Sequence, residues 1–178
     1  EGLPFSSVSE CGLELGSLRF AAAVLGFSGG AVDRRPVLEE MFQADILTVT
    51  SDVEVALTGA LAGDPGIITI AGTGSVAFGK NAAGEKSRAG GWGPLFGDEG
   101  GAFDLARQAL RAALRDQEGW GPPTVLHASL LVQTGEKHVH DLVRRFYTVD
   151  FPPARIASYA KLVDRAARQG DPTALEIL

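Results

Sequence analysis

The sequence is poor in cysteine: Cys11 is the only one among 178 residues. A single cysteine cannot form a disulfide within the chain, and it cannot supply the thiolate cluster that holds zinc or iron–sulfur. We therefore expect a reducing, cytoplasmic environment. Histidine is scarce as well, and His138 and His140 have no third ligand near them in the sequence. We assign no metal site to side chains of this protein.

Basic residues are not in excess, because 16 Lys and Arg stand against 22 Asp and Glu and leave a net charge of −6. No basic stripe is present to bind nucleic-acid phosphates, so we expect no nucleic-acid partner. Long apolar runs are lacking too: the uncharged stretch 66–79 is too short and too glycine-rich to span a bilayer. We expect no membrane partner and find no signal peptide. The start at Glu1 instead of methionine leads us to expect further sequence upstream.

Apolar patterning predicts a mixture of strands and helices. The predicted strands are 19–26, 46–50, 67–71, 76–79 and 85–89, and the predicted helices are 35–43, 52–61, 102–115, 124–132, 138–146, 154–168 and 173–178. The last three strands follow one another through short turns and should form a meander. This order of elements predicts the α/β class.

Glycine is abundant, with 23 residues, and the stretch GGWGPLFGDEGG (90–101) is dense in it. Glycine costs chain entropy, so this concentration is typical of a loop that forms a binding site. Trp92 offers an apolar face to a sugar ring or acyl group, and Asp98 offers two acceptors for hydroxyl groups. Structural alternatives stay open for two of these residues, Trp92 as a core residue and Asp98 as a helix cap, and we assign Glu99 to the start of the helix.

A second glycine turn, Gly72-Thr73-Gly74-Ser75, precedes this loop. It joins two predicted strands, so it is neither a Walker loop nor a Rossmann fingerprint, both of which open a helix. Its successive N–H groups and the hydroxyls of Thr73 and Ser75 are suited to cradle a phosphate. An ordinary hairpin turn has the same composition, and the tetrapeptide alone favours that interpretation.

Asp52 follows the predicted strand 46–50 and opens the predicted helix 52–61. A carboxylate at a strand's end is well placed to accept a proton from a substrate hydroxyl. As a helix cap the same group would stabilise the fold by roughly 1 kcal/mol. The two roles are compatible, because a carboxylate has two oxygens.

Taken in order, five stretches resemble the N-acetylglucosamine kinase branch of the BadF/BadG/BcrA/BcrD-type ATPase family, in the actin/hexokinase-like superfamily. They are LGFSGG (25–30), TSDVEVAL (50–57), IITIAGTGSVAFG (67–79), AGGWGPLFGDEGGAFDLARQAL (89–110) and RIASYAKLVDRAARQGDPTALEIL (155–178). The GGWG and GDEG elements, placed after GTGS, are the most specific. The resemblance implies an actin-like ATPase (ribonuclease H-like) α/β fold with two lobes around a cleft, 1–62 in the N-terminal lobe and 63–178 in the C-terminal lobe.

The resemblance also implies ATP-dependent phosphorylation of an amino sugar, with N-acetylglucosamine at its 6-hydroxyl first, and the cofactors ATP and Mg²⁺. Asp52 matches the catalytic base. The phosphate-binding matches are Gly72, Thr73, Gly74 and Ser75, and the sugar-binding matches are Ser28, Gly29, Gly30, Gly91, Trp92 and Asp98. The implied partners are the amino sugar and ATP, and a homodimer is the assembly we consider.

The chain departs from the family pattern at several places. The first phosphate loop and the adenosine-binding region expected beyond Leu178 are absent, so we expect a fragment of a longer kinase, truncated at both ends. Gly101 stands where the family usually has Ser, and Pro94 where it often has His. Two other functions stay open: an ATPase that activates acyl-CoA reductases or dehydratases, which would need cluster-ligating cysteines, and a non-catalytic sugar sensor, which would not need Asp52.

Overall fold

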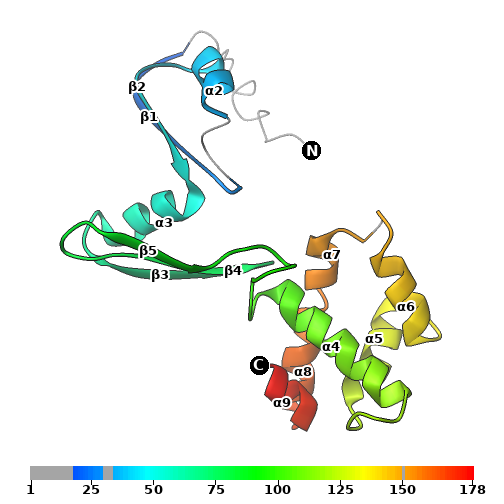
Figure 1. Ribbon diagram of the computed structural model, residues 1–178. Coiled ribbons are helices and arrows are strands. Elements are labelled where there is room, and N and C mark those ends of the chain that lie inside the picture. The colour runs from blue at the N-terminus through cyan, green and yellow to red at the C-terminus, as the bar shows by residue number, and fades with distance from the viewer. Residues whose placement is uncertain (1–17, 30–33, 150) are drawn as a thin grey trace. The chain divides into compact units, whose positions relative to one another are not determined.

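The computed structural model describes residues 18–29, 34–149 and 151–178 (Figure 1). The chain forms two compact units. The first takes its residues from 1–68 and 78–87, and the second from 69–77 and 88–178. In the described part of the chain, no helix combines the length and the apolar character that crossing a bilayer requires.

Two parallel strands organise the first unit. β1 (Arg19–Phe27) pairs with β2 (Gln43–Ser51) so that Phe27 lies opposite Ser51. Parallel strands need a crossover connection, and this one contains helix α2 (Arg35–Met41), which has Pro36 in its first turn and buries Leu38. The helix ends two residues earlier than predicted, because the chain from Gln43 onward pairs with β1 instead.

Helix α3 (Asp52–Leu61) follows β2 without a loop, as the sequence predicts. Ser51 is its N-cap, with a side chain that accepts a hydrogen bond of 3.4 Å from the Glu54 N–H. The helix ends at Ala62, whose φ of 49° is left-handed. Because Ser51 also closes the ladder of β2, the strand's last residue and the helix cap are the same residue.

The predicted meander is confirmed: β3 (Gly66–Ala71), β4 (Ser75–Lys80) and β5 (Lys86–Gly90) form a sheet in the order β3-β4-β5. Their connections are too short for a parallel crossover, so neighbouring strands run antiparallel. The turn between β4 and β5 is closed by the Asn81 side chain, which accepts from the Glu85 N–H at 2.9 Å.

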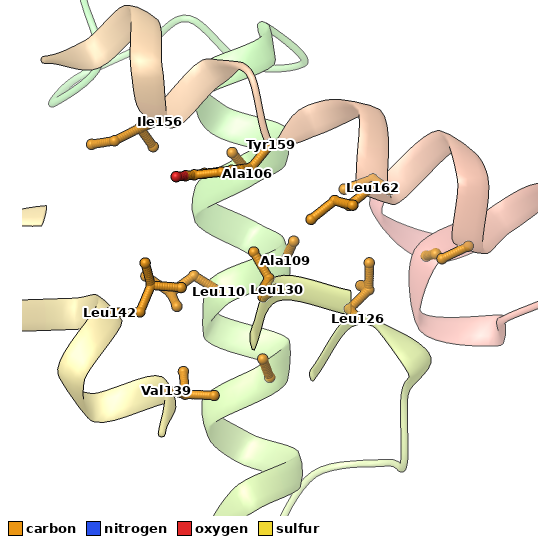
Figure 2. Packing of buried hydrophobic residues seen from close by; sticks show 14 of the residues in the cluster. Ala106, Ala109, Leu110, Leu126, Leu130, Val139, Leu142, Ile156, Tyr159 and Leu162 are labelled. Atoms are coloured by element: carbon orange, nitrogen blue, oxygen red, sulfur yellow. The ribbon is translucent and has the colours of Figure 1, made fainter. Parts of the chain in front are cut away.

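Helices make up most of the second unit. They are α4 (Ala102–Gln117), α5 (Val125–Thr134), α6 (Val139–Phe146), α7 (Pro153–Ala157), α8 (Ala160–Arg168) and α9 (Pro172–Ile177). Figure 2 shows their shared core, in which alanines and leucines of α4 meet Leu126, Leu130 and Leu142. On the inner face of α4, Ala106 and Leu110 are buried. Packing in this core holds α4, and with it the start of that helix, in place.

The single helix predicted over 154–168 is wrong, because the chain breaks into α7 and α8 around Ser158 and Tyr159. The Ser158 hydroxyl donates to the Arg155 carbonyl at 2.6 Å, and the Tyr159 N–H bonds three residues back to Ile156. Such a tightened turn rotates Tyr159 into the core, where its ring stacks on Phe146 at a centroid distance of 6.3 Å. The packing of Tyr159 in the core therefore outweighs the helical spacing of apolar residues that predicted one continuous helix.

A buried carboxylate, Asp171, joins two helix starts in this unit. It caps α9 by accepting from the Ala174 N–H at 2.9 Å, and it accepts from the Val125 N–H at 2.8 Å at the start of α5. The Thr124 hydroxyl donates to it as well. Burial alone would raise the pKa of Asp171, but these hydrogen bonds outweigh burial and hold the pKa below its usual value.

Candidate active site

The predicted site residues of the first unit gather at the carboxyl ends of β1 and β2. Ser28 follows β1 and Asp52 follows β2 at matching positions of the parallel register. The strands are tightly apposed here: a Cβ added to Gly26 would lie 3.2 Å from the Cα of Asp52. Gly29 continues the turn with a φ of +79°, which favours glycine. Gly30 lies outside the described residues.

Asp52 is exposed at the first position of α3. One of its oxygens accepts from the Val53 N–H at 2.9 Å, while the cap position belongs to Ser51. The alternative of Asp52 as the helix cap is therefore wrong. The remaining carboxylate oxygen faces solvent with lone pairs to offer to a hydroxyl group.

The Glu54 carboxylate lies on the same helix but is committed to other partners. Lys86 and the Thr50 hydroxyl donate to it, and these hydrogen bonds lower the pKa of Glu54 against a smaller effect of burial. Glu54 is thus a structural ion-pair partner, and Asp52 is the carboxylate of α3 left for chemistry.

The predicted phosphate turn, residues 72–75, is docked on the start of α4 within the second unit. The N–H groups of Ala102 and Phe103 donate to the carbonyls of Gly72 and Thr73 at 2.8 and 2.9 Å. The Ser75 hydroxyl donates to the Glu99 carbonyl at 2.6 Å. Two N–H groups that a helix start leaves without intrahelical partners are therefore satisfied by the turn, which fixes it in place.

This docking decides which way the turn presents its donors. In a trans peptide the C=O and the following N–H point in opposite directions. Because the carbonyls of Gly72 and Thr73 point at α4, the N–H groups of Thr73 and Gly74 point away from it. Neither N–H has a backbone partner among the residues that the structure describes. Two successive, outward N–H groups are a suitable cradle for an anionic oxygen.

The glycine-rich loop begins at Gly91, where a φ of +70° requires glycine. Arg88 holds this end: its guanidinium donates to the carbonyls of Gly90 and Gly91 and stacks on the Trp92 ring at 5.1 Å. Trp92 is 69% exposed, so the alternative of a core residue is wrong. One face of the indole is covered by Arg88, and the other is open to a ligand.

Asp98 lies deeper in the loop and has an unusual backbone. Its φ of +62° is left-handed, a conformation that non-glycine residues adopt at a cost. Its half-buried carboxylate lies directly on the phosphate turn, because a Cβ added to Gly74 would come within 2.3 Å of the Asp98 Oδ2. The structure thus brings together two candidate groups that the sequence places far apart.

Neither acidic residue of GDEG caps α4. The helix begins at Ala102 with Gly101 as N-cap and no side-chain cap bond. The prediction that Glu99 starts the helix is therefore wrong, because Glu99 lies in the turn before α4. Its carbonyl accepts from Ser75. The Asp98 carbonyl accepts a hydrogen bond from the Gly101 N–H at 2.9 Å, and the Asp98 carboxylate takes no part in capping the helix.

Sequence reasoning missed Asp104 and Arg107. Asp104 is 5% exposed and accepts from the Gly100 N–H, from Arg107 and from Gln108. Burial alone would raise the pKa of Asp104, but these hydrogen bonds outweigh it and lower the pKa. The spacing of an acid three residues after the N-cap, as in a capping box, was the available signal.

The predicted site residues therefore form two groups. Ser28, Gly29 and Asp52 belong to the first unit, and Gly72, Thr73, Gly74, Ser75, Gly91, Trp92 and Asp98 to the second. Each group is held by its own local structure. Among residues 18–29, 34–149 and 151–178, no three His, Cys, Asp or Glu side chains gather as a metal-binding group.

The chain is an α/β protein with the actin-like ATPase fold. The family model described as the BadF/BadG/BcrA/BcrD ATPase family matches residues 7–178. The chain belongs to this family, and both the expected fold class and the expected family are confirmed.

Two curated relatives are sugar kinases by name. An N-acetylmuramic acid/N-acetylglucosamine kinase of Clostridium acetobutylicum is 33% identical over 91% of this chain and 55% of its own length. An N-acetyl-D-glucosamine kinase of Dictyostelium discoideum is 32% identical over 69% of this chain and 41% of its own. The chain thus spans about half the length of these relatives.

Solved structures agree on the fold. A Chromobacterium violaceum protein proposed to be an N-acetylglucosamine kinase is similar with a TM-score of 0.75 and 28% identity, covering 96% of this chain and 59% of its own. A Porphyromonas gingivalis protein of the same proposed identity gives a TM-score of 0.71 at 23% identity, with 97% and 60% covered. The second similarity concerns the fold alone.

Proposed function

We propose that the protein phosphorylates an amino sugar with ATP, with N-acetylglucosamine as the first candidate and the 6-hydroxyl as the acceptor. The single observation that carries this proposal is the contact between the Asp98 carboxylate and Gly74. It sets a group suited to sugar hydroxyls beside N–H groups suited to phosphate. A phosphoryl-transfer enzyme needs this proximity, because its chemistry rests on positioning and charge stabilisation.

The sugar would bind to the loop that begins at Gly91. Trp92 would pack its open face on the ring or the acyl methyl group, and Asp98 would accept from hydroxyls. Ser28, Gly29 and Gly30 would line the same site. Residues 1–62 and 63–178 would belong to the two lobes whose closure excludes water, the competing acceptor.

The phosphates of ATP would bind to residues 72–75, with the N–H groups of Thr73 and Gly74 as donors and Thr73 and Ser75 as the hydroxyl residues. Mg²⁺ fits this site as a companion of the phosphates, since it takes few protein ligands and its charge would offset the nearby Asp98. Bound there, it would neutralise charge on the transferred group. Asp52 would orient the attacking hydroxyl and accept its proton.

A sugar panel tests the proposal. The complete gene product is incubated with ATP, Mg²⁺ and N-acetylglucosamine, glucosamine, N-acetylmuramic acid or no sugar, and ADP is measured. We expect one amino sugar to stimulate ADP formation. Slow ADP formation indifferent to every sugar would favour an activator ATPase, and sugar binding without turnover would favour a sensor. The cytoplasmic location expected from the lone Cys11 belongs to the same proposal.

A further inference from the structure

Two polar side chains of α4 hold the glycine-rich loop at two points. Arg107 donates from Nη1 to the Pro94 carbonyl at 3.1 Å and from Nη2 to the Asp104 carboxylate at 2.6 Å. The other oxygen of Asp104 accepts from the Gly100 N–H at 3.1 Å. The chain from Pro94 to Gly100 is thereby fixed at both ends to one ion pair.

Asp98 lies between these two anchor points. Its left-handed backbone persists only where the surroundings determine it, since a free chain would relax to negative φ. Gly100, two residues further on, is the anchor nearest to it. The Asp98 and Glu99 carbonyls hold the backbone here as well, through Gly101 and Ser75, so we expect loss of either anchor to loosen the loop and shift the Asp98 carboxylate relative to Gly74 without unfolding the segment.

The composition of the pair also points to a task beyond helix stability. Asp104 is almost fully buried, and the Arg107 Nε is buried without a hydrogen-bond partner among the described residues. Burial of a carboxylate and of a donor that has no partner is costly, even though the rest of the Arg107 side chain is partly exposed. An aliphatic side chain at these positions would pack, but it could not reach the loop's carbonyl and N–H groups.

We infer that Asp104 and Arg107 are positioning residues for sugar binding, which act through the loop 94–100 to hold Asp98. This inference rests on the proposed function and adds two residues to it. The planar fork of arginine bonds a carboxylate and a carbonyl at once, which the single ammonium of lysine cannot reproduce. Arg107→Lys is therefore the most informative conservative variant.

The test compares Arg107→Lys and Asp104→Asn with Arg111→Lys, which changes an exposed arginine one turn further along α4. Binding of N-acetylglucosamine and of ADP to the complete gene product is measured by calorimetry. We expect each site variant to weaken sugar binding about tenfold, the effect of one lost charge-assisted hydrogen bond. ADP binding should change less than about twofold, within a few tenths of a kcal/mol, and Arg111→Lys should change neither.

A double-mutant cycle separates positioning from general destabilisation. In an Asp98→Asn background, which already lacks the carboxylate, Asp104→Asn should add little further loss of sugar affinity. Equal losses of sugar and ADP binding, or additive losses in the cycle, would overturn the inference. If Asp104→Asn does not fold, the same cycle with Arg107→Lys decides.

The two proposals fail in different ways. If the wild-type protein binds no amino sugar, the proposed function falls and the positioning role falls with it. If the wild-type protein binds sugar and the two variants bind it equally well, only the positioning role is overturned.

Discussion

Replacement of Gly101 by alanine tests whether the phosphate turn is docked on α4 as described. Gly101 is the N-cap of α4 and has a φ of −67°, so alanine meets no backbone strain. Its Cβ would lie 2.7 Å from the carbonyl carbon and 2.8 Å from the Cα of Gly74, and 2.9 Å from the Asp98 carbonyl oxygen. All three neighbours are backbone atoms, so no side-chain rotation can relieve the contact.

The expected cost follows from three terms. Overpacking against a rigid neighbour costs about 1–3 kcal/mol. Alanine at an N-cap costs roughly 0.5–1 kcal/mol more than glycine, and the lower entropy of the unfolded chain returns about 0.4–1 kcal/mol. The last two terms offset each other, so Gly101→Ala should lower the free energy of unfolding by about 2 kcal/mol. For a chain of this size that is a fall in Tm of about 4–8 °C.

Thermal unfolding followed by circular dichroism measures this change. The control is Gly59→Ala, inside α3, where an added Cβ meets nothing within 4 Å. Alanine is the better helix former, so the control should gain roughly 0.5–1 kcal/mol. A Gly101→Ala protein that melts at or above the wild-type temperature would refute the docking of residues 72–75 on α4.

Three further predictions concern the proposed site and the fold. Gly74→Ala should displace the flexible Asp98 carboxylate, weakening sugar binding measured by calorimetry while Tm stays near the wild-type value; unchanged affinity would refute the contact. Asp52→Asn should lower kcat by roughly 10²–10⁴-fold with sugar binding kept, and near-normal turnover would exclude Asp52 as the base. The lowered pKa of Asp171 stabilises the fold above the unfolded-state pKa of about 3.9, and that stability is lost as the pH falls through the folded-state pKa. Asp171→Asn should therefore flatten the acid side of the stability–pH curve, and an unaltered curve would contradict the assignment.

Local sequence patterns were enough for most of the secondary structure. The β-branched run before Asp52, the turn residues around Asn81 and the apolar stripe of α4 each act over a few residues, and the predicted elements are confirmed there. The break at Tyr159 was missed because it depends on a ring contact with Phe146 across the core. A helical stripe carries no information about such a contact.

The residue types of the site could be predicted from the sequence, but their arrangement in space could not. GTGS and GDEG could be singled out as glycine-rich, yet the contact between Asp98 and Gly74 joins residues distant in sequence and depends on the docking of the turn on α4. Arg88 and Arg107 carry no mark in the sequence that separates them from solvent-exposed arginines. Their role is visible only from the loop carbonyls that they reach.

The most direct test of the proposed reaction is to follow where the γ-phosphate of ATP goes. The complete gene product is incubated with ATP, Mg²⁺ and the amino sugar that stimulates it, and the phosphorus-containing products are identified by ³¹P nuclear magnetic resonance. A 6-phosphate ester of the sugar, formed in step with ADP and absent with the 6-deoxy sugar, is the predicted result. Transfer of the γ-phosphate to water alone, giving only ADP and inorganic phosphate with or without sugar, would contradict the assignment of a sugar kinase.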